Sequence, residues 1–152
     1  MATYRDSPYG AFNFIVALGG AQGSGDENII GGFSDASGLG FEVSYAEYRN
    51  GNEKFNTNRK IPNTHKNDDV TLKRGLIGSD DLFQWLKGVR DGTIDRRNIS
   101  ITLLDEARNP VVTFTLKNAQ PKKYSGPTLA AKGGSDVAME ELHLVHEGIE
   151  YK

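Results

Sequence analysis

The chain has 152 residues, of which 37% are hydrophobic and 25% charged, a composition typical of one soluble domain with an ordinary core. Lys and Arg number 18 against 20 Asp and Glu, so the net charge of −2 argues against general attraction to nucleic acid. The sequence contains no cysteine, which excludes disulfides, thiolate metal sites and cysteine catalysis, and its 18 glycines predict many tight turns.

The N-terminal region is expected to hold two strands around a glycine-rich turn. Residues 12–18 alternate in side-chain character and predict a strand that is largely buried on both sides. Residues 29–37 hold a short strand broken by two glycines. The segment between them, residues 19–28, lacks the Gly-Lys-Ser/Thr of a phosphate-binding loop, so we interpret it as a turn.

Residues 41–48 predict a further strand, which leads into the most unusual stretch of the chain. In that strand Phe41, Val43 and Tyr45 share one face, while Glu42 and Ser44 take the other. From residue 49 to residue 66 the alternation disappears, and asparagine, glycine and proline become frequent. Connections longer than about 12–15 residues are uncommon in compact domains. We therefore predict a long irregular connection over residues 49–66, with a functional role or, as the alternative, as a disordered surface loop.

The clearest pattern in the sequence is a strand, a helix and a strand over residues 70–105. Residues 70–75 and 98–104 predict the two strands. Between them we expect the only helix, over about residues 79–91, with Ser79 as its N-cap and Gly92 at its C-terminal end. Its apolar stripe, which must pack on a sheet, consists of Leu82, Trp85, Leu86 and Val89.

The C-terminal region predicts two more strands, over residues 112–117 and 137–146, separated by a Gly/Pro/Lys-rich connection over residues 121–134. The alternation of the last strand changes phase at Glu140 and Glu141, which predicts a β-bulge or a strong local twist there. The whole pattern indicates a mainly β, single-domain fold over residues 1–152. We expect an antiparallel barrel or sandwich of about six or seven strands with one flanking α-helix.

Candidate catalytic and metal-binding residues are few. His143 and His146 are three apart in a predicted strand and so point to opposite faces, which does not suit a metal pair. The adjacent Asp80 and Asp81 are explained by the positive end of the helix dipole. We therefore predict that the protein is no enzyme and needs no cofactor or metal.

Export and membrane signals are also missing from the sequence. The longest apolar stretch falls far short of the roughly 20 residues that span a bilayer, so no stable membrane insertion is expected. The N-terminal residues lack the pattern of a signal peptide. We expect synthesis in the cytoplasm and, if the protein leaves the cell, release by lysis.

A series of short segments along the chain resembles the tail-tube proteins of contractile phages and of phage-like contractile injection systems. The segments are DSPYGAFNF at residues 6–14, GFSDASGL at 32–39, LKRG at 72–75, DLFQW at 81–85, RRNISITLLD at 96–105, NAQP at 118–121, YSGP at 124–127 and LVHEG at 144–148. Their order and spacing carry the resemblance. It implies a β-barrel or sandwich similar to the haemolysin-coregulated protein of type VI secretion.

The resemblance further implies six-membered rings that stack into a hollow tube inside a contractile sheath. Sheath contraction would drive the tube through a target envelope, with a cargo effector or DNA in the lumen. The partners implied are other copies of the chain, the sheath protein, and the baseplate, spike and terminator proteins. Whether the particle is a phage tail or an extracellular or intracellular injection system stays open at this point.

Two sets of residues become candidates for assembly on this interpretation. The connection would be an arm between subunits or rings, built from Arg49, Asn50, Glu53, Lys54, Phe55, Arg59, Lys60, Ile61, Pro62, His65 and Lys66. The polar positions Glu42, Ser44, Ser100 and Thr102 would line the lumen. The alternative is a small β-barrel module that binds, for example, single-stranded nucleic acid, which would require aromatic residues interleaved with a basic groove.

Overall fold

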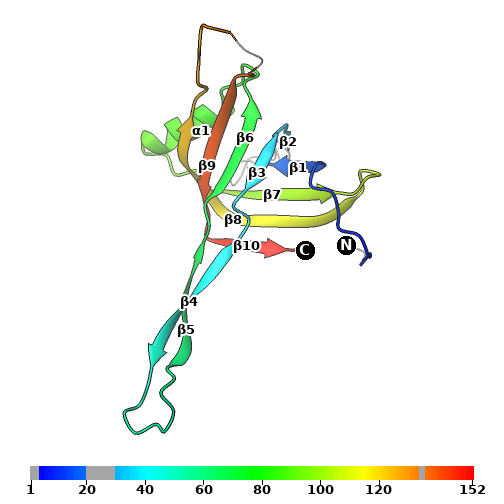
Figure 1. Ribbon diagram of the computed structural model, residues 1–152. Helices are drawn as coiled ribbons and strands as arrows, with labels where there is room; N and C mark the ends of the chain where they lie inside the picture. Colours follow the sequence, from blue (N-terminus) through cyan, green and yellow to red (C-terminus); the bar gives the residue numbers. More distant parts are fainter. Residues whose placement is uncertain (1–3, 20–29, 134–135) are drawn as a thin grey trace.

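The computed structural model describes residues 4–19, 30–133 and 136–152 as ten strands and one helix (Figure 1). The elements are β1 (Phe14–Ala17), β2 (Ile30–Gly31), β3 (Asp35–Ser37), β4 (Phe41–Tyr48), β5 (Arg59–Asn67), β6 (Val70–Gly75), α1 (Asp81–Arg90), β7 (Arg97–Leu104), β8 (Pro110–Ser125), β9 (Met139–Val145) and β10 (Gly148–Tyr151). The predicted mainly β, antiparallel fold with one helix is confirmed. The described strands outnumber the six or seven expected because several are very short.

The body is a β-sandwich made by folding one sheet along strand β8. The first half of β8 pairs with β7 and β10, and its second half pairs with β9. We call β2, β1, β7, the first half of β8 and β10 sheet A, and the second half of β8, β9, β6 and β3 sheet B. The bend lies near Asn118, whose positive φ of 51° marks a break in the strand. All the pairings are antiparallel.

The hydrophobic core lies between the two sheets. Sheet A contributes Val16, Ile99 and Leu116, and sheet B contributes Leu72 and Leu142, all of them buried. Along β6, β9 and the first half of β7 the buried residues recur at every second position, because successive side chains of a strand point to opposite faces.

Helix α1 closes one end of this sandwich. Leu82 and Trp85 are buried against the core, whereas Leu86 and Val89 are half-buried at its margin. The Trp85 indole Nε1 donates a hydrogen bond to the carbonyl of Asp95 at 3.0 Å, and the Arg97 guanidinium lies 4.5 Å from the Trp85 ring centre. The helix is thereby attached to the start of β7.

The start of α1 differs from the prediction. The N-cap is Asp80, which makes no side-chain capping hydrogen bond, and the Ser79 hydroxyl donates instead to the Asp81 carboxylate at 2.9 Å. The predicted N-cap role of Ser79 is therefore wrong. Gly92 has the expected left-handed conformation, φ +99°, and its N–H donates to the carbonyl of Val89 at 3.1 Å.

Two predictions about the C-terminal region are also wrong, and one strand was not predicted. Strand β8 continues through Pro121 to Ser125, where a connection was expected, because Pro121 falls at a register shift in the pairing with β9. Strand β9 pairs with β6 without interruption, so the predicted bulge at Glu140 is absent from it. Residues 148–151 form β10, which hydrophobic alternation did not indicate.

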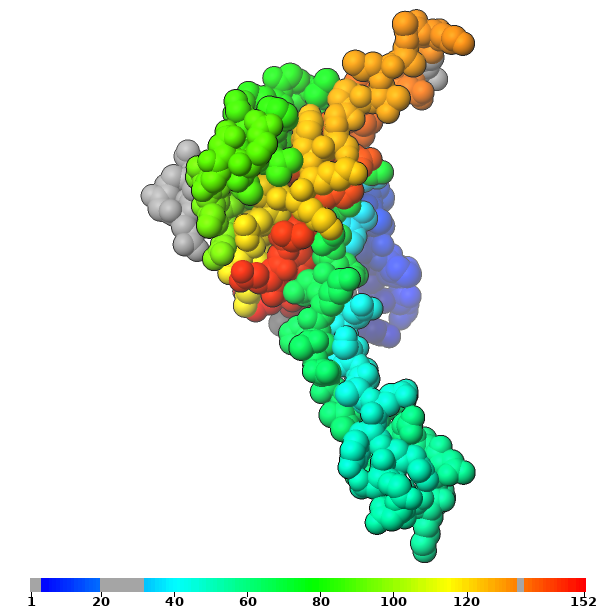
Figure 2. Space-filling view, turned by 90° about the vertical axis from the view of Figure 1, so that its left-hand side faces the viewer, coloured from blue at the N-terminus to red at the C-terminus, as the bar shows by residue number. Residues whose placement is uncertain are grey.

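The β4–β5 hairpin leaves the body as a separate two-stranded sheet and projects far from the core (Figures 1 and 2). Gly38 precedes it with φ +85°, and a Cβ at this position would lie 2.1 Å from the carbonyl oxygen of Asp69. Only glycine therefore fits where the chain turns out of the sandwich. Among the described residues, no helix is long and apolar enough to cross a membrane.

Candidate assembly interface

The projecting hairpin, here called the arm, covers residues 41–67 and replaces the irregular connection expected over residues 49–66. Arg59–Asn67 is strand β5, paired with β4, so only residues 49–58 form the connecting loop. The prediction of an irregular segment over residues 59–66 is wrong. The alternation signal is missing from β5 because neither of its faces packs on the core, and its side chains from Arg59 to Lys66 are all exposed.

One face of the arm carries a row of apolar side chains from β4, with His65 and Asn67 of β5 opposite two of them. Phe41, Val43 and Tyr45 lie on this face, and Pro62 stands opposite Tyr45 in the register. The exposed fractions of Phe41 and Tyr45 are 59% and 58%. No other element of the described chain covers these side chains, so the structure presents an apolar arm face that lacks an intramolecular partner.

The opposite face of the arm mixes charged and apolar groups. Glu42 lies opposite Lys66, and Ala46 lies opposite Ile61. A register shift near Ser44 leaves β5 with one extra residue, which is the arrangement of a β-bulge. His65 stands opposite Val43 on the apolar face.

The tip of the arm is braced by polar contacts. The Arg49 guanidinium donates to the carbonyls of Glu53 and Phe55, both at 3.0 Å, and to the Asn56 side chain at 3.2 Å. Arg59 forms an ion pair with Glu53 at 2.9 Å. At the base of the loop, the Lys60 ammonium contacts Glu47 and lowers the pKa of that carboxyl group. The tip therefore has a defined conformation even though it touches nothing else.

The candidate assembly residues divide between the loop and the strand. Arg49, Asn50, Glu53, Lys54 and Phe55 lie in the loop, and Arg59, Lys60, Ile61, Pro62, His65 and Lys66 lie on β5. Phe55 is 81% exposed at the tip. The structure thus brings all of these residues together on the arm.

The four lumen candidates are not brought together. Ser100 and Thr102 lie on β7, on the outer face of sheet A, whereas Glu42 and Ser44 lie on the arm. Thr102 pairs with Thr113 across β8, their hydroxyls 3.2 Å apart, and Ser100 pairs with Thr115.

The outer face of sheet A carries few charged groups, and one of them is Lys152, which lies beside Thr113. Beside its hydroxyl groups, the Lys117 ammonium forms an ion pair with Glu150 at 2.5 Å, which lowers the pKa of the Glu150 carboxyl group. Sequence alternation identified the two hydroxyls on β7, but only the strand pairing shows that those of β8 extend the same face.

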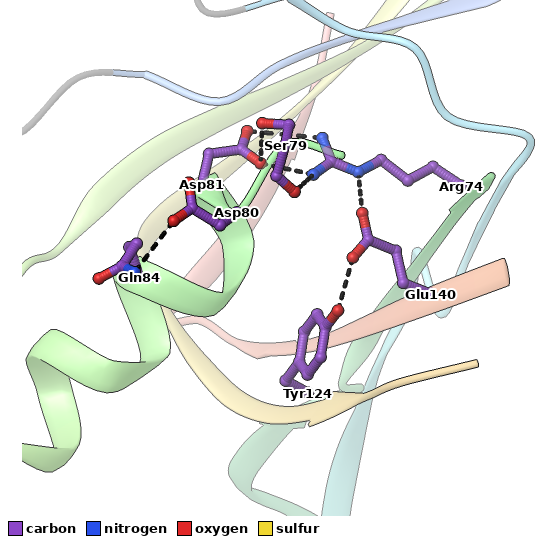
Figure 3. Close-up of polar contacts among 7 residues, drawn as sticks. All are labelled: Arg74, Ser79, Asp80, Asp81, Gln84, Tyr124 and Glu140. Atoms are coloured by element: carbon purple, nitrogen blue, oxygen red, sulfur yellow. Dashed lines mark hydrogen bonds and ion pairs between the residues drawn. The ribbon is translucent and has the colours of Figure 1, made fainter. Parts of the chain in front are cut away.

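A buried polar network joins α1 to sheet B and was missed from the sequence (Figure 3). Arg74 and Glu140 are 3% and 1% exposed, and they form an ion pair between β6 and β9. The Tyr124 hydroxyl donates to Glu140 at 2.6 Å, and the Arg74 guanidinium also binds Asp81 at 2.5 Å. The network fixes the first turn of the helix to the sheet.

The network shifts the pKa values of three of its members, Arg74, Asp81 and Tyr124. The hydrogen bond to Glu140, together with burial, raises the pKa of Tyr124 to about 12. Burial would raise the pKa of Asp81, but hydrogen bonds from Arg74 and Ser79 hold it below its usual value. Every polar partner in this network is a side chain or backbone group of the fold itself, which is the arrangement of a structural ion pair.

Two of the three histidines, His143 and His146, make local structural contacts. His143 Nδ1 lies 3.1 Å from the Thr71 hydroxyl, and His146 Nε2 lies 3.0 Å from the carbonyl of Asp68. Within the part of the chain that the structure describes, no group of His, Asp and Glu side chains could hold a metal ion.

A sandwich with a projecting, unpartnered arm defines a structural subunit built to contact other molecules. The chain belongs to the T4-like virus tail tube protein gp19 family, whose model matches residues 10–150. It is therefore a structural tail tube protein and not an enzyme, as the sequence segments predicted. A comparison with curated proteins found no significant match.

Solved structures of contractile injection systems contain similar chains. A chain of the sheath–tube complex of an extracellular contractile injection system, PVC, is 26% identical, with a TM-score of 0.82 over 97% of this chain and 93% of that chain. One in the anti-feeding prophage baseplate is 23% identical, with a TM-score of 0.84 over 97% of each. Hcp1 from Flavobacterium johnsoniae shares the fold at 12% identity and a TM-score of 0.54, over 91% of this chain and 93% of that chain.

Proposed function

We propose that this protein assembles into six-membered rings that stack into the hollow inner tube of a contractile phage tail or phage-like injection particle. The observation that carries the proposal is the arm, whose apolar side chains are exposed in the single chain. A two-stranded hairpin is marginally stable alone in water. Contact with another copy would bury the apolar arm face and stabilise the hairpin, and a head-to-tail contact of this kind closes into rings or extends into filaments.

The partners proposed are the sheath, the baseplate with its spike, and a tube terminator. Support comes from the similar chains, which occur in a sheath–tube complex, a baseplate, a terminating cap and a sheath/tube terminator. Contraction of the sheath would drive the tube through a target envelope. Synthesis in the cytoplasm and release by lysis, both expected from the sequence, stay predictions.

Microscopy of the purified protein tests the proposal directly. We expect negative-stain images to show rings or tubes of uniform diameter for the unmodified chain. Deletion of residues 52–58, in the arm loop, is expected to abolish stacking while circular dichroism and thermal unfolding of the body stay unchanged, because this loop contributes nothing to the core. A protein that stays monomeric at high concentration would contradict the proposal, and normal tubes from the deletion variant would contradict the role of the arm.

The outer face of sheet A is the surface that we propose for the lumen wall. Its hydroxyls and its Lys117–Glu150 ion pair make it polar, with Lys152 as a further positive charge beside Thr113, and a hydrophilic wall would let cargo protein or DNA slide without sticking. Glu42 and Ser44 lie on the arm and would join this wall only where the arm of one copy meets the sheet of another.

Thiol labelling in assembled tubes tests the lumen assignment. We expect Ser100→Cys to react with a small maleimide and to be protected from a maleimide carried on a large polymer, because the polymer cannot enter the tube. Gln84→Cys, on α1, serves as the outward control and is expected to react with both reagents. Equal reaction of Ser100→Cys with both reagents would overturn the assignment.

A further inference from the structure

The two ends of the sandwich are not alike. At the start of β7, beside Arg97, helix α1 covers the core with Leu82 and Trp85. At the other end of β7, six residues and about 20 Å away, Leu103 lines an open groove of about 340 Å³. No helix of the described chain closes this second end.

The lining of the groove is mostly apolar. Phe14, Ile101, Leu103 and Phe114 come from sheet A, and Ala36 and Leu39 come from β3 and the segment that follows it. Phe14, Ala36, Leu39 and Phe114 are only partly buried against the core. The groove is thus the exposed edge of the core, at the place where sheet A and β3 diverge.

Among the described residues that line the groove, Asp35 is the only charged one, and Ser34 lies beside it. A negative group at the rim of an apolar groove favours an apolar side chain that arrives with positive charge around it. An occupant from the same chain would need an apolar side chain on a segment able to reach this end of the body.

The arm tip has an apolar side chain surrounded by positive charge, but it lies too far from the groove of its own chain to reach it. Phe55 is 81% exposed, and its neighbourhood carries Arg49, Lys54 and Arg59 against a single acidic residue, Glu53. The arm holds its tip far from the body (Figures 1 and 2). The Arg49 guanidinium holds the carbonyl of Phe55, so the ring is presented by a braced loop and little conformational entropy is lost on docking.

We propose that Phe55 of one copy inserts into the open end of the sandwich of a second copy and closes its core there, as α1 does at the opposite end. The inference rests on the proposed tube function and deepens it by naming the anchor and its receptor. A buried aromatic anchor in an apolar pocket is the usual centre of binding energy in a protein interface. Each copy has one tip and one groove, so the contact is head-to-tail and repeats along the assembly.

Disulfide trapping between two different chains tests this contact. Because the sequence has no cysteine, chains carrying Lys54→Cys, which keep the Phe55 anchor, can be mixed with chains carrying Ala36→Cys, and a second mixture can use Leu39→Cys. A disulfide requires the two Cα atoms to lie within about 4.4–6.8 Å, so only a docked tip can form it. The control mixture pairs Lys54→Cys with Gln84→Cys on the exposed side of α1.

We expect mild oxidation of assembled protein to give cross-linked dimers with the groove cysteines at a yield at least tenfold above that of the control. Normal tubes from these variants with no excess of cross-linking at either groove position would overturn the docking of Phe55 and leave the tube function standing. If the unmodified protein forms neither rings nor tubes, the proposed function fails first and the docking fails with it.

Discussion

Replacement of Glu140 by Leu is expected to destabilise the protein by about 3–5 kcal/mol, the usual cost of removing one partner from a buried ion pair. Arg74 would keep its charge with only 3% of its surface exposed, and the Tyr124 hydroxyl would lose its acceptor. Because small domains are stable by only about 5–15 kcal/mol, the variant should lose a large fraction of its free energy of unfolding. The midpoint of urea unfolding measures the effect.

The neighbouring residue supplies the matched control. Glu141 is half-exposed on β9 and forms a surface pair with Lys73 at 3.4 Å, so Glu141→Leu should change stability by no more than about 0.5 kcal/mol. The triple replacement Arg74→Met, Glu140→Leu and Tyr124→Phe should recover most of the lost stability, because it removes the buried polar groups together. Equal destabilisation by Glu140→Leu and Glu141→Leu would show that the buried network contributes no more to stability than a surface ion pair.

Glu140 also explains one error of the sequence interpretation. A glutamate at an inward position breaks the apolar alternation of β9, and the break looks like a change of phase. Its partner Arg74 breaks the alternation of β6 in the same way, directly opposite in the register. Two charged residues of opposite sign at inward positions of neighbouring strands would have indicated a buried pair, but only once the pairing of β6 with β9 was known.

The parts of the fold that pack against the core were predictable, and the parts that do not were less so. Strand β6 was predicted at its true bounds, because its alternate residues are buried. Strand β5 has no buried face within the chain, so its sequence carries no periodic signal of a strand. The arm was foreseen from its length and polarity, whereas the groove that we propose as its receptor depends on tertiary contacts between β3 and sheet A.

Replacement of the three apolar side chains Phe41, Val43 and Tyr45 by Ser is expected to abolish tube formation without unfolding the subunit. Their exposed fractions in the single chain are 59%, 38% and 58%, so their removal takes little from the core. Burial against another copy would contribute about 2 kcal/mol for each side chain. The triple variant should therefore weaken each contact on the order of ten-thousandfold.

Sedimentation of assembled material, together with thermal unfolding of the soluble fraction, separates assembly from folding in this experiment. The matched control is Glu42→Gln with Ser44→Asn, two replacements on the opposite face of the same strand, which should leave most of the protein in the tube fraction. A triple variant that still pellets as tubes would show that the apolar arm face is not buried between copies. If the tubes are lost and the melting temperature of the soluble fraction also falls strongly, these side chains stabilise the subunit itself. The arm would then have to fold back on its own body in solution, a contact that its present geometry does not make.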